Sequence, residues 1–135
     1  MKEPPDELCL ADTIGVGVPS QVKRLISEVR GMGVTTGAHF HNTRNTGYAN
    51  AVAALEAGAT VFDASVGGAG GCPFAPRATG NIATEDLVYL FEGMGVRTGV
   101  DLDSLIETSG WLAERLGKPL PGLLAKAGPF RAISA

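Results

Sequence analysis

Three short runs of apolar residues have the length expected of β-strands, at residues 8–11, 37–42 and 60–65. A segment with helical character follows each run. Strands that alternate with helices pair in parallel, and the connections cross over with a right hand. The pattern therefore predicts an α/β fold made of about three strand–helix units.

The helices are marked by apolar stripes and by residues that start or end a helix. The first stripe recurs at i, i+3, i+4 and i+7 behind Pro19, and its members are Val22, Leu25, Ile26 and Val29. An alanine-rich helix over 48–57 is expected to end at Gly58. Thr84 and Asp101 are predicted to cap two further helices, and Gly117 is predicted to end the second of them. In the helix that begins at Thr84, we expect Glu85 and Asp86 to complement the helix dipole.

The length of the chain conflicts with a closed barrel. A (β/α)₈ barrel needs about 250 residues, whereas this chain has 135. Three parallel strands cannot close into a barrel. The chain is therefore either a small open sheet or a part of something larger.

Composition and charge exclude several classes of protein. The net charge is −3 and the chain has no run of Lys or Arg, which argues against a nucleic-acid or anionic-membrane surface. No stretch approaches the roughly 18 apolar residues of a membrane span, and the first residues do not resemble a signal peptide. We therefore expect a cytoplasmic protein without nucleic-acid or membrane partners.

Polar side chains gather at the carboxyl ends of the predicted strands. His39 and His41, the two histidines of the chain, project to the same face of the second strand. Two imidazoles at this spacing can bind one metal ion; alternatively they are ordinary histidines at the end of a strand. Asp12 and Asp63 lie near the ends of the first and third strands, where parallel α/β folds carry their chemistry. Asp12 could equally form a turn or cap a helix.

The two cysteines have different surroundings. Cys9 lies within an apolar strand and is predicted to be a small core residue. Cys72 follows the glycine-rich segment 67–71, at the same end of the sheet as the histidines. An ordinary thiol stays mostly protonated at neutral pH and can donate a proton. Cys72 is thus a candidate acid, or a loop cysteine without a role.

Four motifs, in this order and spacing, resemble 3-hydroxy-3-methylglutaryl-CoA (HMG-CoA) lyase. They are DTIGVG at 12–17, HFHNT at 39–43, SVGGAGGCPFA at 65–75 and GNIATEDLV at 80–88. The glycine-rich stretch that ends in Cys-Pro is the most specific, and the resemblance covers about residues 6–128. It implies a TIM barrel of the pyruvate-carboxyltransferase-like kind, with residues 1–128 as its C-terminal part and 129–135 as a tail.

The resemblance implies a set of site residues. His39, His41 and Asn81 would bind Mg²⁺ or Mn²⁺, with His39 and Cys72 as catalytic residues and Cys72 as the acid that protonates the acetyl-CoA carbanion. Asp12 would contact the substrate. The implied reaction cleaves HMG-CoA to acetyl-CoA and acetoacetate. The family's aspartate ligand and its neighbouring arginine, in an Arg-Asp-Gly-Leu-Gln-like motif, are absent from this chain, and Asn42 stands where some members carry aspartate.

Unpaired strand edges imply partners for this chain. Three parallel strands leave an open edge on each side, so the chain is expected to associate with copies of itself or with the missing N-terminal half of the barrel. Alone, it is expected to bind divalent metal poorly and to lack lyase activity. Two alternatives remain open: a fragment of a related acyl-CoA aldolase or synthase, and a non-catalytic interaction module.

Overall fold

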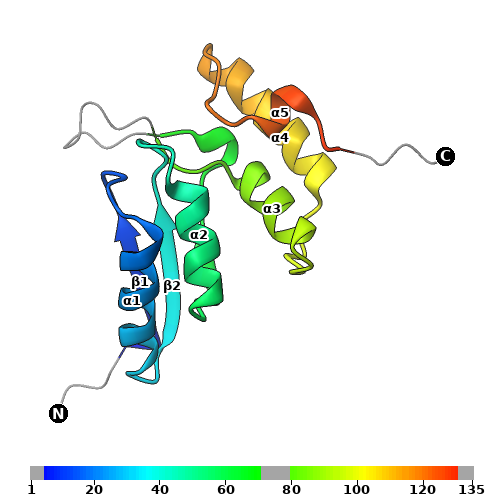
Figure 1. The fold of residues 1–135 in the computed structure, drawn as a ribbon. Coiled ribbons are helices and arrows are strands. Elements are labelled where there is room, and N and C mark those ends of the chain that lie inside the picture. Colours follow the sequence, from blue (N-terminus) through cyan, green and yellow to red (C-terminus); the bar gives the residue numbers. More distant parts are fainter. Residues whose placement is uncertain (1–4, 71–79, 131–135) are drawn as a thin grey trace.

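The computed structural model describes residues 5–70 and 80–130 of the chain. Strands and helices alternate through the first half, and helices make up the second (Figure 1). The elements are β1 (Glu7–Asp12), α1 (Pro19–Arg30), β2 (Thr35–Phe40), α2 (Gly47–Glu56), β3 (Val61–Asp63), the 3₁₀ turn η1 (Val66–Gly68), α3 (Thr84–Gly93), α4 (Leu102–Leu116) and α5 (Leu124–Ala127).

The three strands form one parallel sheet in the order β1-β2-β3. The central strand β2 places His39 opposite Ala11 of β1 and opposite Asp63 of β3. In Figure 1, α1 and α2 run beside the sheet, and α3, α4 and α5 are gathered away from β1. The predicted strand–helix units and parallel pairing are confirmed.

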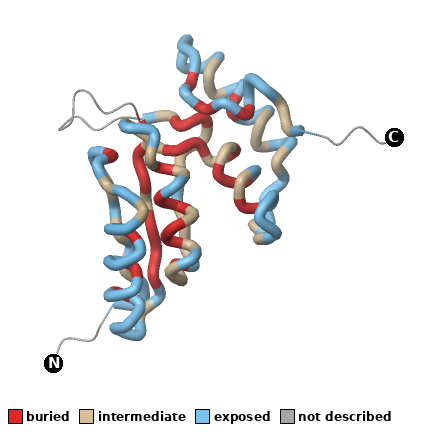
Figure 2. The backbone as a smooth tube through the Cα atoms, viewed as in Figure 1, coloured by how far each residue is buried: buried red, intermediate tan, exposed pale blue. Residues whose placement is uncertain are grey.

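The core lies between β2 and the helices that cover one face of the sheet. Buried positions concentrate in β2 and on the facing sides of α1 and α2, whereas α4 and α5 are largely exposed or half-buried (Figure 2). The buried apolar cluster contains Val22, Ile26, Ala38, Phe40, Ala51, Ala53, Ala54, Ala59, Ile82, Leu87 and Phe91. Among the described residues, none of the helices has the length and apolar character needed to cross a bilayer.

The prediction that Cys9 is a core residue is wrong. Cys9 is exposed, and so are Glu7 and Ala11, which share its face of β1. The helices cover the opposite face, where Leu10 packs against the core. Side chains of a strand alternate between faces, so an apolar run on a sheet covered from one side is only half buried.

Several predicted helix ends are confirmed. Pro19 begins α1, and Gly58 and Gly117 adopt positive φ just after α2 and α4. Asp101 caps α4 by accepting hydrogen bonds from the backbone N–H groups of Asp103 and Ser104. Leu25 departs from its expected stripe, since it is 42% exposed on α1.

Thr84 does not cap α3, contrary to prediction. It is the first residue of the helix, after Ala83 in extended conformation. The Thr84 N–H donates to the Ser65 carbonyl at 2.9 Å, and the Ser65 N–H donates to the Ile82 carbonyl at 3.2 Å. Backbone pairing with the residue that follows β3 therefore holds the start of α3, and no side-chain cap is formed.

Tyr48 of α2 links this start to the rest of the molecule. Its hydroxyl accepts a hydrogen bond from the Ala83 N–H at 2.9 Å and donates to Asp86 Oδ2 at 3.0 Å. Burial, aided by the Asp86 carboxylate, raises the pKa of Tyr48, so the hydroxyl keeps the proton that it donates. Asp86 also accepts hydrogen bonds from the backbone N–H groups of Leu123 and Leu124. Asp86 therefore joins three segments, a role beyond the dipole complementation that was expected.

We predict that Tyr48→Phe lowers the free energy of unfolding by about 1–3 kcal/mol, because it leaves the Ala83 N–H and the Asp86 carboxylate without this partner. Urea unfolding followed by circular dichroism measures the loss. Tyr89→Phe is the matched control, since Tyr89 is 40% exposed and its hydroxyl has no hydrogen-bond partner among the described residues. Equal losses in the two variants would contradict the prediction.

Candidate functional site

Two imidazoles meet at the carboxyl end of β2. His39 belongs to the strand, and His41 follows it directly. Their ring centroids are 5.2 Å apart, with one ring edge-on to the other. The two side chains therefore share one face, as predicted, and lie close enough to contact a single ion.

Asn81 is brought beside His41 by backbone pairing. His41 and Asn81 form an antiparallel bridge, the Ile82 N–H donates to the Phe40 carbonyl at 3.1 Å, and the Asn42 N–H donates to the Gly80 carbonyl at 3.2 Å. The Asn81 side-chain nitrogen donates to the Ala69 carbonyl at 2.9 Å. This bond leaves the amide oxygen as the free end of the side chain.

Asp63 holds the ring of His39. Asp63 Oδ2 lies 2.6 Å from His39 Nδ1, and Asp63 is mostly exposed whereas His39 is not. A carboxylate on one ring nitrogen fixes the orientation of an imidazole and leaves the other nitrogen free. The other Asp63 oxygen lies 3.8 Å from Cys9 Sγ, and partial desolvation of the thiol together with the Asp63 carboxylate raises the pKa of Cys9.

His41 is buried, with 6% of its surface exposed. Its Nδ1 has no hydrogen-bond partner among the described residues. Burial and the neighbouring His39 lower the pKa of His41, and Asp12 opposes this shift. The ring therefore stays neutral near pH 7 and keeps a lone pair that can bind a metal ion.

The donor set fits part of the coordination shell of a divalent cation. Two imidazoles and one amide oxygen suit a transition-metal ion such as Mn²⁺, and the amide oxygen also suits Mg²⁺. The described residues contain no group of three or more His, Cys, Asp and Glu side chains that could hold a metal ion. The three predicted ligand residues are neighbours in the fold, and they would leave coordination positions of such an ion open.

Asp12 is engaged in a turn. Its two carboxylate oxygens accept hydrogen bonds from the N–H groups of Val16 and Gly17, at 3.0 and 2.9 Å. The structure thus forms the turn that was the alternative interpretation of Asp12. Contact between Asp12 and a substrate stays a prediction. Cys72 lies outside the described residues, so its predicted role also stays a prediction.

Two residues make contacts that the sequence did not predict. Asp63 was recognised only as a residue near a strand end, although parallel pairing places it opposite His39. Glu85 was assigned to the helix dipole, yet it is fully buried and accepts a hydrogen bond from the Gly67 N–H at 2.9 Å. No spacing rule in the sequence predicts that contact.

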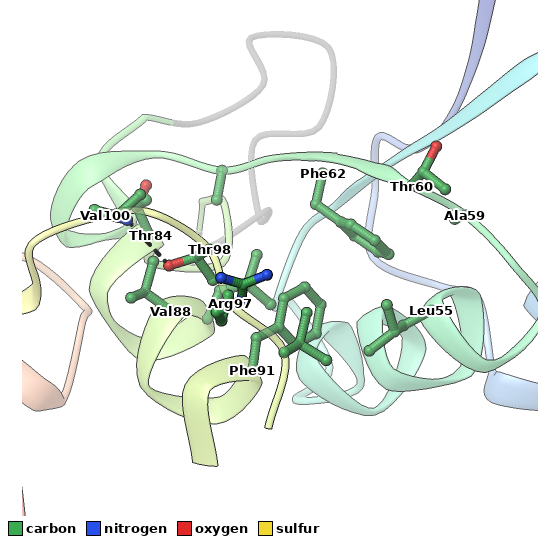
Figure 3. Close-up of a pocket in the computed structure, with 13 residues that line it drawn as sticks. Leu55, Ala59, Thr60, Phe62, Thr84, Val88, Phe91, Arg97, Thr98 and Val100 are labelled. Atoms are coloured by element: carbon green, nitrogen blue, oxygen red, sulfur yellow. Dashed lines mark hydrogen bonds between the residues drawn. The ribbon is translucent and has the colours of Figure 1, made fainter. Parts of the chain in front are cut away.

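An apolar pocket of about 450 Å³ lies apart from these residues (Figure 3). It is formed by α2, β3, α3 and the segment 96–100, and Phe62 meets Phe91 in it with ring centroids 5.0 Å apart. None of the three predicted ligand residues lines it. Its polar members are Thr60, Thr84, Arg97 and Thr98, and its lining contains no imidazole, carboxylate or carboxamide group of the kind found beside β2.

Comparison with known proteins gives this arrangement a family. The family model described as HMGL-like matches residues 4–111, which is most of the chain. The chain belongs to the HMGL-like family. The prediction that it is the C-terminal part of a TIM barrel resembling HMG-CoA lyase is confirmed.

Relatives in this family are acyl-CoA lyases by name. The chain is 60% identical over 125 residues to (R)-citramalyl-CoA lyase of Chloroflexus aurantiacus. This match covers 91% of this chain and 39% of that protein. It is 49% identical over 117 residues to hydroxymethylglutaryl-CoA lyase of Bacillus subtilis, covering 85% of this chain and 39% of that protein. The chain thus spans about two fifths of the length of these relatives.

A solved structure agrees with the family assignment. The HMG-CoA lyase of Acinetobacter baumannii, in complex with coenzyme A and 3-methylmalate, superposes with a TM-score of 0.88 at 49% identity. The match covers 94% of this chain and 42% of that one. The three strands described above are therefore part of an HMG-CoA lyase type of barrel.

We predict that His41 titrates below 6.5 in metal-free buffer. Between that lowered pKa and 6.5, His41 of the unfolded chain binds a proton and His41 of the folded chain does not. The contribution of His41 to the free energy of unfolding is therefore complete above pH 6.5 and is lost as the pH falls through the lowered pKa. NMR titration of the two imidazoles, assigned with His41→Gln, measures the midpoint. A midpoint at or above 6.5 for His41 would contradict the prediction.

Proposed function

We propose that this chain forms the C-terminal part of a metal-dependent lyase that cleaves HMG-CoA to acetyl-CoA and acetoacetate. The observation that carries the proposal is the meeting of His39, His41 and Asn81 at the carboxyl end of β2, in a chain of the HMGL-like family. In TIM barrels this end of the strands carries the chemistry.

His39, His41 and Asn81 hold a Mg²⁺ or Mn²⁺ ion in this proposal. Such an ion, when bound, would polarise the hydroxyl and carbonyl oxygens of the substrate. Asp63 orients the His39 ring by its contact with Nδ1, and the Ala69 carbonyl orients the Asn81 amide by accepting a hydrogen bond from its nitrogen. Hydrogen bonds of this kind, from other protein groups to the side chains that bind a metal, fix the orientation of those side chains and raise the basicity of an imidazole.

The two roles predicted for His39 compete for one nitrogen. Its Nδ1 is engaged by Asp63, so Nε2 alone is free to bind a cation or to accept a proton. Our proposal gives Nε2 to the cation, because a base at this position would first have to release the ion.

The reaction also requires an acid. A general base supplied by the remainder of the barrel takes up the hydroxyl proton, the carbon–carbon bond breaks to form acetoacetate, and the electron pair of that bond passes to the acetyl-CoA carbon. This carbanion takes up a proton, which the Cys72 thiol supplies in our proposal. A protonated thiol near neutral pH is suited to that step.

Citramalyl-CoA is the second candidate substrate, because the citramalyl-CoA lyase shares the higher identity of the two relatives, 60% against 49%. The two compounds are CoA thioesters of 3-hydroxy-3-methyl dicarboxylic acids that differ by one methylene. Cleavage of citramalyl-CoA yields pyruvate in place of acetoacetate, and the acetyl-CoA half is the same. The same three ligand residues and the same acid would therefore serve either substrate.

Complete barrels test the proposal. This chain is joined to the remainder of the Bacillus subtilis HMG-CoA lyase in one chimera and of the Chloroflexus aurantiacus citramalyl-CoA lyase in another, and both are assayed with Mg²⁺ and Mn²⁺. We expect the first chimera to release acetoacetate from HMG-CoA, and the isolated chain to show no turnover. Release of pyruvate alone by both chimeras would favour citramalyl-CoA. No cleavage of either thioester by folded chimeras would refute the proposal.

In an active chimera we predict that Cys72→Ala lowers kcat by about 10²–10⁴-fold, the usual contribution of a positioned general acid. KM should change little, because the thiol acts on the carbanion that forms during cleavage and contributes little to substrate binding. Steady-state kinetics separate the two constants. An unchanged kcat would remove Cys72 from the mechanism.

A further inference from the structure

Glu85 is a carboxylic acid buried without any exposed surface in the first turn of α3. The proposed reaction does not use it. Its Oε2 accepts a hydrogen bond from the Gly67 N–H at 2.9 Å, and its Oε1 is buried without a partner among the described residues. Burying such a group costs free energy unless its hydrogen bonds compensate. The hydrogen bond from the Gly67 N–H therefore compensates for part of the cost of burying Glu85.

Gly67 lies in the turn η1 with positive φ, as does Gly68. Its N–H is bound by Glu85, and its carbonyl accepts a hydrogen bond from the Gly122 N–H at 2.8 Å. A β-carbon at Gly67 would collide with Leu120, and one at Gly122 would lie 2.8 Å from Glu85 Oε1. The turn is thus held on both sides, from α3 and from the segment before α5.

The position of η1 determines the orientation of the Asn81 side chain. The Ala69 carbonyl, one residue after η1, accepts the hydrogen bond from the Asn81 side-chain nitrogen. A β-carbon at Gly80 would lie 2.8 Å from the Gly68 carbonyl oxygen and 2.7 Å from that of Gly70, so the two backbone segments touch. Any shift of the turn therefore moves the group that decides which end of the Asn81 amide is free.

We propose that Glu85 is the positioning residue for Asn81. By holding the Gly67 N–H it fixes the turn 67–69, whose last carbonyl binds the Asn81 nitrogen and leaves the amide oxygen free for a divalent cation. The proposal rests on the proposed function only for the metal; the positioning itself exists in the metal-free chain.

The test measures hydrogen exchange by NMR in the ¹⁵N-labelled, metal-free chain. The probes are the Asn81 side-chain NH₂ and the Gly67 N–H, each normalised to the N–H of Ile26, a core residue that is 1% exposed. Normalisation separates a local change from a general loss of stability. In Glu85→Leu we expect both normalised rates to rise at least about tenfold, as for loss of a buried hydrogen bond.

Two further variants make the result specific. Glu85→Gln keeps an oxygen acceptor, so both rates should stay within about twofold of the native chain. Ser109→Ala is the matched control, because Ser109 is buried against Gly67 from α4 but takes no part in the chain of contacts from Glu85 to Asn81. An unchanged Asn81 rate in Glu85→Leu, or equal acceleration in Glu85→Gln and Glu85→Leu, would overturn the proposal.

A second measurement decides the matter if Glu85→Leu does not fold. Scalar coupling across the Gly67 N–H···Glu85 and Asn81 N–H···Ala69 hydrogen bonds is expected in the native chain, and absence of either coupling would overturn the proposal. Added Mn²⁺ then tests the metal separately in the chimera with the remainder of the Bacillus subtilis lyase, where the coordination shell is complete, by broadening of the His39, His41 and Asn81 signals. Positioning without broadening would contradict the metal assignment and leave the role of Glu85 standing.

Discussion

Backbone hydrogen bonds between residues 80–84 and the ends of the strands hold the site together. The Phe40 carbonyl accepts from the Ile82 N–H, and Ser65 pairs with both Ile82 and Thr84. These bonds return the chain to the sheet after the long glycine-rich connection. Asn81 therefore lies beside His41, and α3 begins at the carboxyl end of the strands.

The first turn of α3 uses two neighbouring acids in different ways. Glu85 is buried and binds the glycine turn that precedes Asn81, whereas Asp86 binds Tyr48 of α2 and the backbone at the start of α5. Both acids satisfy N–H or O–H donors that would otherwise lack partners inside the protein. One helical turn thereby connects the site to the helices that surround it.

The uncovered surfaces of the chain agree with its place in a larger barrel. One face of β1 is exposed, including Cys9, and an apolar pocket opens beside β3 and α3. The relatives are longer, and this chain spans about two fifths of them. Apolar surface of this kind is normally covered by further strands and helices of a barrel, and the ligand set beside β2 is likewise partial.

The sequence by itself determined the strand–helix alternation, the shared face of His39 and His41, and the cap at Asp101, because each depends on local periodicity or on neighbours within a few residues. Only the tertiary structure decided that Asp63 holds His39, that Glu85 holds Gly67 and that Cys9 is exposed. These outcomes depend on contacts between segments distant in the chain and on which face of the sheet the helices cover. Local sequence patterns do not specify either.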